Sequence, residues 1–274
     1  MSKMTDGDDI KRRIPEIARA SLAAVDWFAE LESTNTWLKQ KTPPPRSRFH
    51  AVIAEHQTGG RGRNGKIWLS PPSTGICLSV AYTFSEMPRD LPALTLAVGV
   101  GLAELMEKIG ARGVALKWPN DLILAGGKLG GILTETQSGG AGDRTVIVGV
   151  GINVDLPHSM RNPMSARWTY GIADLASCMD TVPDRSELSP VIITSLMASI
   201  RRFESEGLSA FRSRWPAHDW LRGRTITVQQ AGGEVTGDAD GIDEDGALLV
   251  KTAAGTERVI SGSVRVATGT EVRG

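Results

Sequence analysis

Hydrophobic positions alternate between strand-like and helix-like spacing from residue 25 to about residue 220. Residues 91–109 form the clearest predicted helix, because Leu91, Leu94, Val98, Leu102, Leu105 and Ile109 recur at helical spacing. Further helices are predicted over 191–203 and 208–215. Apolar runs bounded by turn signals predict strands over 51–54, 75–84, 114–117, 122–124, 130–136 and 145–154. This alternation predicts an α/β domain.

The two ends of the chain differ from this central region in their pattern of residues. Residues 1–9 are polar and predicted to be disordered, and residues 10–24 to form one helix. From Arg224 onward, short β-rich runs over 225–230, 234–237, 247–252 and 258–261 are separated by glycine turns, which indicates a small β-barrel. The expected organisation is therefore an N-terminal extension over 1–24, a central domain over 25–221 and a C-terminal domain over 222–274.

Composition narrows the classes of function. The 274 residues contain 31 Lys and Arg and 31 Asp and Glu, so the net charge of zero argues against general binding to nucleic acid or membranes. Two cysteines cannot form a disulfide framework and four histidines show no metal-ligand spacing. No apolar run reaches the roughly 18 residues of a membrane span. We therefore expect a cytoplasmic protein with no membrane attachment.

A glycine-rich segment over 57–66 carries three cations, Arg61, Arg63 and Lys66. Its glycines match both a dinucleotide-binding fingerprint and the start of a P-loop, but both motifs require a helix directly afterwards. Pro71 and Pro72 argue against a helix there, so both matches are rejected. Two interpretations remain, a loop whose amides and arginines bind an anion and a solvated, flexible hairpin loop.

The segment 116–121, Leu-Lys-Trp-Pro-Asn-Asp, predicts a strand that ends in a turn. Lys117 and Asp121 flank this turn and are expected to lie close together. One interpretation is an ATP site with Lys117 near the phosphates and Asp121 near Mg²⁺, since magnesium is commonly held by one or two carboxylates plus phosphates. The alternative is a hairpin with a surface salt bridge.

Three further segments each have a functional and a structural interpretation. Lys128 stands among glycines at 126–131, either beside a ligand or as an exposed turn lysine. Gly149, Gly151 and Asn153 share one face of a strand, which leaves space for a ligand or for a packed helix. Ser33 and Thr34 precede a helical segment, either as an N-cap or as contacts to a small polar ligand.

Together these segments resemble bacterial biotin protein ligases. The motifs that carry the resemblance are Ser33-Thr34-Asn35, Gln57-x-x-Gly60-Arg61-Gly62-Arg63-x-Gly65, Trp68, Lys117-Trp118-Pro119-Asn120-Asp121, Gly127-Lys128-Leu129-x-Gly131 and Gly149-x-Gly151-Ile152-Asn153. The resemblance is strong over about 28–154 and looser afterwards. Some members of this family carry an N-terminal DNA-binding domain. The roughly 25 residues before the central domain are too few for one, so the chain resembles the ligase-only type, with no specific DNA binding expected.

The resemblance implies an α/β (α+β) fold, a class II synthetase-like catalytic domain with a central mixed sheet, followed by an SH3-like barrel. It implies that biotin and MgATP give biotinyl-AMP, and that biotin then passes to a lysine of a biotin carboxyl carrier protein, a subunit of acetyl-CoA carboxylase or a related carboxylase. A homodimer is compatible with it.

The resemblance also assigns residues, and each is carried onto the matching position of this chain. Biotin contacts are implied for Ser33, Thr34, Asn35, Gln57, Gly60, Arg61, Gly62, Arg63, Lys128 and Gly131. Nucleotide contacts are implied for Arg61, Arg63, Trp68, Lys117, Asn120, Asp121 and Asn153. Lys128, Arg63 and Lys117 are the expected catalytic cations, and Asp121 is the expected Mg²⁺ ligand.

Two other functions remain open at this point. A lipoate or octanoate ligase or transferase shares the general fold, and a Lys-Trp-Pro-Asn-Asp segment also occurs in lipoate ligases. The Gly-Arg-Gly-Arg loop and the C-terminal domain favour biotin. A non-enzymatic ligand-binding protein would bind without consuming ATP, whereas the cations clustered in glycine loops favour an enzyme that joins two anions.

Overall fold

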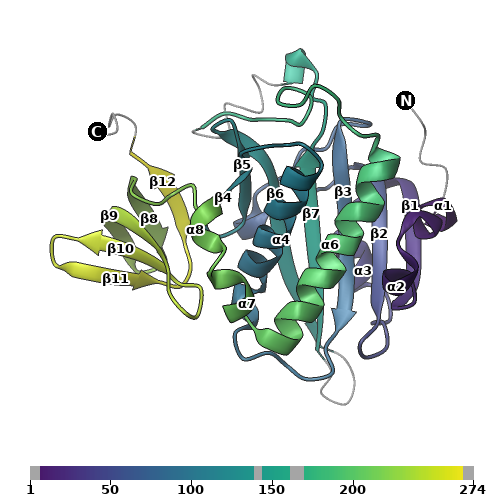
Figure 1. The fold of residues 1–274 in the computed structure, drawn as a ribbon, viewed down its shortest axis with the longest axis horizontal. Coiled ribbons are helices and arrows are strands. Elements are labelled where there is room, and N and C mark those ends of the chain that lie inside the picture. Colours follow the sequence, from purple (N-terminus) through teal and green to yellow (C-terminus); the bar gives the residue numbers. More distant parts are fainter. Residues whose placement is uncertain (1–6, 139–143, 161–169, 268–274) are drawn as a thin grey trace.

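A computed structural model describes residues 7–138, 144–160 and 170–267. A seven-stranded mixed sheet in the order β1-β2-β3-β7-β6-β5-β4 forms the centre of the molecule (Figure 1). Only β1 and β2 pair in parallel, and the other neighbours are antiparallel. The strands are β1 (Leu22–Leu31), β2 (Phe49–Gln57), β3 (Gly75–Thr83), β4 (Ala115–Lys117), β5 (Asp121–Leu124), β6 (Gly127–Ser138) and β7 (Arg144–Asn153).

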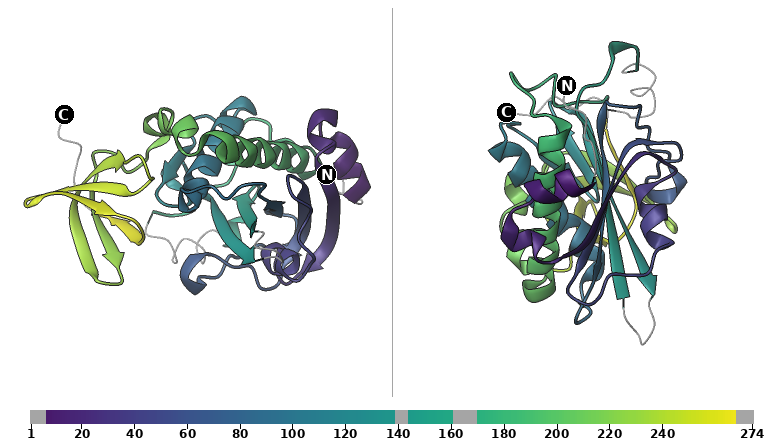
Figure 2. Two further views of the ribbon diagram at one scale, coloured as in Figure 1. Left: turned by 90° about the horizontal axis from the view of Figure 1, so that it is seen from below. Right: turned by 90° about the vertical axis from the view of Figure 1, so that its right-hand side faces the viewer.

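One face of this sheet is closed by two long helices, α4 (Leu94–Lys108) and α6 (Arg185–Glu206) (Figures 1 and 2). The apolar face of α4 and the even-numbered valines of β7 lie in one buried core. Asp184 and Glu187 form a capping box at the start of α6, which satisfies amides of its first turn. The predicted helix over 91–109 is confirmed, except that its first turn, Leu91–Ala93, is a 3₁₀-helix. The helix predicted over 208–215 is two short ones, α7 (Ser209–Arg212) and α8 (Trp215–His218).

On the opposite face of the sheet, the described residues place one helix, the short α3 (Thr34–Lys39), which packs on β2, β3 and β7. Beside α3 the glycine-rich loop (residues 59–66) crosses the same face, and within it a 3₁₀ turn, η1, covers Arg63–Gly65. The thin cover leaves part of the sheet accessible, so side chains on this face are available for a site. None of the helices in the described part of the chain is long and apolar enough to span a bilayer.

The N-terminal prediction needs correction. Residues 10–24 do not form one helix, because α1 (Gly7–Arg13) and α2 (Glu16–Arg19) are separated at Pro15, and strand β1 already begins at Leu22. Ile10 and Ile14 are almost fully buried in the main core, so α1 packs on the sheet beside β1. The predicted disorder over 1–9 concerns residues that lie mostly outside the described part of the chain, and Gly7–Asp9 are helical.

The C-terminal prediction is also only partly right. An antiparallel sheet in the order β11-β10-β9-β8-β12 is formed by β8 (Thr225–Gln230), β9 (Gly233–Ile242), β10 (Leu248–Thr252), β11 (Gly255–Val259) and β12 (Ser263–Val266). In the described residues β11 and β12 are edges that do not pair with each other, so the sheet is not a closed barrel. Sequence patterning missed the four-residue strand β12.

The C-terminal sheet lies next to the β4 end of the central sheet (Figure 1), and polar contacts join the two. The indole Nε1 of Trp118 donates to the Gly246 carbonyl at 3.0 Å, and Lys117 Nζ donates to the Val264 carbonyl at 2.9 Å. The Trp220 amide donates to the Leu116 carbonyl at 3.0 Å. The turn predicted from Lys-Trp-Pro-Asn-Asp therefore also serves as the joint between the two domains.

Candidate active site

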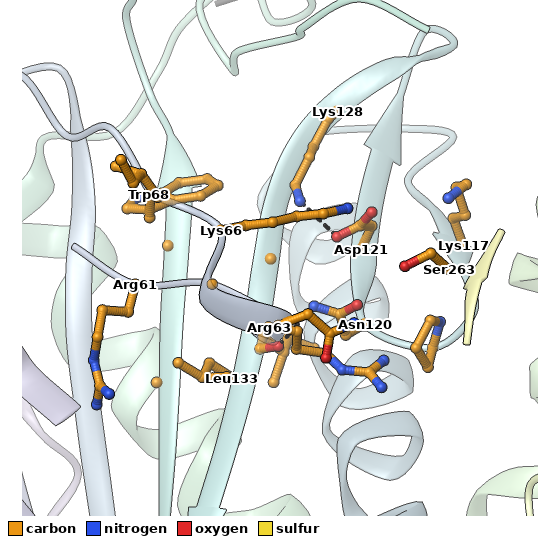
Figure 3. A pocket seen from close by; sticks show the side chains of 18 of the residues that line it. Arg61, Arg63, Lys66, Trp68, Lys117, Asn120, Asp121, Lys128, Leu133 and Ser263 are labelled. Atoms are coloured by element: carbon orange, nitrogen blue, oxygen red, sulfur yellow. Dashed lines mark hydrogen bonds and ion pairs between the residues drawn. The ribbon is translucent and has the colours of Figure 1, made fainter. Parts of the chain in front are cut away.

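A cavity of about 460 Å³ opens on the α3 face of the sheet. It lies between the glycine-rich loop, strands β6 and β7, the β4–β5 turn and strand β12, and Figure 3 shows its charged side chains. Most residues predicted from the motifs line it. They are Ser33, Thr34, Asn35, Gln57, Arg61, Gly62, Arg63, Trp68, Lys117, Asn120, Asp121, Lys128 and Gly131.

One end of the cavity is polar but uncharged. Ser33 is the N-cap of α3, as the structural interpretation predicted, and its hydroxyl accepts from the Thr36 amide. Gln57 Oε1 accepts from the amide and the hydroxyl of Thr34 at 2.8 and 3.1 Å. The fully buried Ser79 lies within 2.6 Å of Thr34 Oγ1 and 2.5 Å of Asn35 Oδ1. This network fixes donors and acceptors for a small neutral polar group.

The glycine face of β7 is filled by side chains from other segments. A Cβ at Gly149 would lie 2.3 Å from Asn35 Oδ1, and a Cβ at Gly151 would lie 2.4 Å from the Trp68 ring. Only glycine permits these approaches. These glycines therefore leave room for Asn35 and Trp68, which lie in the wall of the cavity. Both interpretations of this strand face hold in part, because helix α3 packs on it and the cavity lies beside it.

The glycine-rich loop is a hairpin. The Gly62 amide donates to the Lys66 carbonyl at 2.7 Å, and the Trp68 amide donates to the Gly60 carbonyl at 2.9 Å. Asn64 and Gly65 at its tip have positive φ angles of 55° and 72°. Arg61, Asn64 and Lys66 are exposed. The hairpin expected from the structural interpretation is therefore present, and it is placed over the cavity.

At the other end of the cavity, Lys128 Nζ lies 2.6 Å from Asp121 Oδ1 (Figure 3). Both residues are buried, with 6% and 8% of their surfaces exposed. Lys128 is therefore not an exposed turn lysine, and Asp121 is not part of a surface salt bridge. Burial lowers the pKa of Lys128, and the Asp121 carboxylate opposes that shift. A buried pair of this kind is costly unless a ligand or further hydrogen bonds compensate.

Lys117 and Asp121 are paired residues of the β4–β5 hairpin, as predicted. Burial lowers the pKa of Lys117 to about 8, and the positive charges of Lys128 and Lys66 contribute to this effect. Burial likewise lowers the pKa of Arg63, opposed by Asp121. The positive charges of Lys117, Lys128 and Lys66 therefore act on one another at this end of the cavity.

Most of the charged residues in the lining are cationic. Six lining residues carry a positive charge, namely Arg61, Arg63, Lys66, Lys117, Lys128 and Arg265, whereas in the described residues Asp121 is the one carboxylate in the lining. The Arg61 guanidinium lies 2.9 Å from Glu135 Oε2, beside the cavity. The remaining cations make this end a site for anions.

Two predicted residues do not line the cavity. Gly60 belongs to the glycine-rich loop but is not among the lining residues, and its carbonyl accepts from the Trp68 amide. Asn153 donates from Nδ2 to the carbonyls of Lys128 and Ala173, at 3.2 and 3.0 Å. Asn153 therefore holds the main chain at Lys128 in place, a role that its motif did not reveal.

Several lining residues were not assigned from the sequence. Lys66 was recognised as a cation but given no role, and Leu133 lies two residues after Gly131 on the same face of β6. Tyr170 falls in a stretch without periodicity, and Ser263 and Arg265 come from the missed strand β12. Local patterning carries no signal for contacts between two domains, so this part of the site was invisible in the sequence.

The donor set fits Mg²⁺ held together with a nucleotide. In the described part of the chain no three His, Cys, Asp or Glu side chains converge on one point. Asp121 offers one buried carboxylate among cations that suit phosphates. This matches the way magnesium binds through one or two carboxylates plus substrate phosphates, so Asp121 remains the candidate ligand.

Known proteins share both domains of this architecture. The model of the Biotin/lipoate A/B protein ligase family matches residues 27–153, and that of the Biotin protein ligase C terminal domain matches 222–266. A biotin–[acetyl-CoA-carboxylase] ligase from Mycobacterium tuberculosis is 31% identical over 276 residues, which cover 95% of this chain and 98% of that protein. The chain belongs to the biotin protein ligase family. The C-terminal match decides between the biotin and lipoate branches that the first model joins.

Other similar proteins support the same family membership. The bifunctional ligase/repressor BirA of Escherichia coli is 35% identical over 223 residues, which cover 81% of this chain and 67% of that protein. The solved structure of the biotin protein ligase from Aquifex aeolicus in complex with biotin and ATP aligns with a TM-score of 0.70 and 25% identity, over 89% of this chain and 100% of that chain. The α/β catalytic domain predicted from the sequence is confirmed.

Proposed function

We propose that this biotin protein ligase binds biotin and ATP next to each other in the cavity. The enzyme joins biotin to ATP and then to a protein lysine. Biotin's ring binds at the uncharged end, among Ser33, Thr34, Asn35, Gln57 and the main chain near Gly131. Its carboxylate points toward Arg63 and Lys128. The triphosphate binds among the remaining cations, and Trp68 packs on the adenylate or the biotin tail.

One observation supports this arrangement most directly. Cations from the loop, the β4–β5 turn and β6 converge around Asp121, the one carboxylate that the described residues contribute to the lining, next to an uncharged polar network. A carboxylate and a phosphate repel each other, so joining them requires such a concentration of positive charge. The uncharged network provides the complementary surface for a neutral ureido ring.

The reaction needs no nucleophile from the protein. A biotin carboxylate oxygen attacks the α-phosphorus, and the bond from that phosphorus to the bridging oxygen breaks, so pyrophosphate leaves. Lys128 and Arg63 neutralise charge on the reacting oxygens, and Asp121 holds Lys128. Mg²⁺ bound with the nucleotide supplies further charge neutralisation, with Asp121 as its protein ligand.

In the second half-reaction a lysine amine of the acceptor attacks the acyl carbon of biotinyl-AMP. The carbon–oxygen bond to AMP breaks, AMP leaves, and the amine loses a proton to solvent. We propose that the acceptor is a biotin carboxyl carrier protein. The glycine-rich loop screens the mixed anhydride from water until the acceptor arrives.

The test of the first half-reaction is ATP–pyrophosphate exchange by the full chain with either biotin or lipoate. We expect exchange that depends on biotin and saturates with it, and little exchange with lipoate. Exchange supported equally by lipoate would contradict a site built for biotin. Biotin binding without any exchange would support a non-enzymatic binding protein.

A further inference from the structure

Glu135 lies on the cavity side of β6, although it does not line the cavity. Residues 131, 133 and 135 share one face of the strand, and the first two line the cavity wall. The intervening Thr134 points the other way, where its hydroxyl meets Thr95 of α4. Glu135 is therefore the next side chain along the wall, beyond the uncharged end of the site.

Its carboxylate gathers donors from two other segments. Asn35 Nδ2 donates to Oε2 at 2.9 Å, and Lys39 Nζ lies 3.0 Å from Oε1. Arg61 Nη2 reaches both oxygens, at 2.9 and 3.3 Å. The first two come from α3 and the third from the glycine-rich loop. One carboxylate thus joins strand, helix and loop around the uncharged end of the cavity.

The carboxylate is held as an anion. Burial alone would raise the pKa of Glu135, but the hydrogen bonds from Asn35 and Lys39 and the charge of Arg61 outweigh it and lower the pKa. The side chain is only 17% exposed, so its charge is poorly screened. Contacts to such an anion are stronger than those between neutral groups.

The Arg61 guanidinium is directed away from the reacting end of the cavity. In Figure 3 it points to the side opposite Lys128 and Asp121, whereas Lys66 points toward Asp121. Arg61 is nevertheless among the residues that line the cavity, and its main chain is bridged to Ile67 across the hairpin. The structure therefore holds the Arg61 side chain at Glu135 while the rest of the residue stays in the hairpin beside the cavity.

We propose that Glu135 is a positioning residue for biotin binding, which holds Arg61 and so sets the main chain of the glycine-rich loop beside the uncharged end of the cavity. This inference rests on the proposed function for the identity of the ligand. It reassigns the Arg61 side chain from substrate contact to anchoring. It also explains why Asn35 and Lys39 of α3, the helix at the same end of the cavity, contact the same carboxylate.

The proposal is tested by the kinetics of biotin-dependent ATP–pyrophosphate exchange in the full chain. Glu135→Gln keeps the shape and removes the charge, and it is expected to raise KM for biotin about tenfold with kcat changed less than about twofold. Arg61→Met should do the same, and the double variant should be no worse than either single one. A fall in kcat with unchanged KM for Arg61→Met, or additive losses in the double variant, would overturn the proposal.

Lys39→Met is the matched control. It removes the other cation on the same carboxylate, but from the exposed side of α3 rather than from the loop. KM for biotin should stay within about twofold of the original. A rise as large as that of Glu135→Gln would mean that Glu135 acts through α3 alone, which contradicts an anchor for the loop.

A measurement without substrates separates this inference from the proposed function. In the unliganded chain, trypsin should cut after Arg63 at least about threefold faster in Glu135→Gln and in Arg61→Met, because the loop has lost its anchor. Unchanged cleavage would contradict the anchor even if exchange is normal. If the original chain shows no biotin-dependent exchange, the proposed function fails, while the cleavage result still decides whether Glu135 holds the loop.

Discussion

At the scale of single residues, the site depends on charges that are kept out of water. Lys128 and Asp121 form a buried pair 2.6 Å apart, and Lys117 lies across the same hairpin from Asp121. The motifs predicted which residues gather here. They did not predict that these side chains are buried. The nucleotide contact expected for Asn153 stays a prediction, while in the structure its side-chain amide donates to the carbonyls of Lys128 and Ala173.

Removing the charge of Lys128 should stop the first half-reaction. Lys128→Met is expected to lower the rate of biotin-dependent ATP–pyrophosphate exchange by about 100-fold or more. It should also lower the free energy of unfolding by about 3 kcal/mol, because the Asp121 carboxylate loses its partner in a buried site. Stopped-flow or exchange kinetics and urea unfolding measure the two effects.

The double variant Lys128→Met/Asp121→Asn separates catalysis from stability. It removes both charges, so much of the lost unfolding free energy should return while exchange stays low. If the double variant regained both stability and exchange, Lys128 would be a structural residue only.

The low pKa of Lys117 predicts a pH-dependent stability. Its pKa is about 8 in the folded chain and 10.5 in the unfolded chain, so between these values the unfolded state binds more protons. Folded stability attributable to Lys117 therefore rises as pH increases from 8 to 10. Relative to Lys117→Met, the free energy of unfolding of the original chain should increase by about 1–3 kcal/mol over that interval, as measured by urea unfolding. A constant difference between the two proteins would show that the pKa of Lys117 is not lowered.

At the scale of elements, the glycine-rich loop illustrates what sequence patterning can and cannot predict. Its composition indicated both a hairpin and an anion-binding loop, and the structure contains a hairpin placed over the cavity. Strands β2 to β7 and helix α4 were predicted because each has its own apolar periodicity. Strand β1 was not predicted, and the single helix expected over 10–24 is replaced by α1, α2 and the start of β1, with the two helices separated at Pro15.

We predict that ligand binding protects this loop. Arg61 is exposed at its start and Arg63 is partly exposed beside its tip, so trypsin should cut at both sites in the unliganded chain. Biotin should slow these cuts severalfold, because it orders the loop. Cleavage after Arg13, exposed at the end of α1, is the internal control and should not change. Equal loop cleavage with and without biotin would show that the loop does not close on the ligand.

At the scale of the whole molecule, the C-terminal sheet completes the site. Ser263 and Arg265 of β12 line the cavity, and Lys117 Nζ is held by the carbonyl between them. The family resemblance predicted this domain, but no local pattern predicted its contact with the cavity. The joint at Trp118 therefore couples the C-terminal sheet to the end of the cavity that holds Lys117, where we propose that the nucleotide binds.

Trp118→Phe tests this coupling. The substitution removes the indole donor and leaves the Gly246 carbonyl without that partner in a buried joint. We expect a loss of about 2 kcal/mol in the free energy of unfolding and a higher KM for ATP, with KM for biotin little changed. Urea unfolding and exchange kinetics measure these. An effect on biotin alone would contradict the placement of ATP beside the joint.

The claim that this chain activates biotin with ATP and transfers it to a carrier protein is tested most directly by complete turnover. The full chain is incubated with biotin, MgATP and a biotin carboxyl carrier domain, and the intact mass of the carrier is measured. The account predicts that the carrier gains the mass of one biotinyl group, that the gain requires ATP, and that replacing the acceptor lysine by arginine abolishes it. A carrier of unchanged mass, or one modified equally well when lipoate replaces biotin, would contradict it.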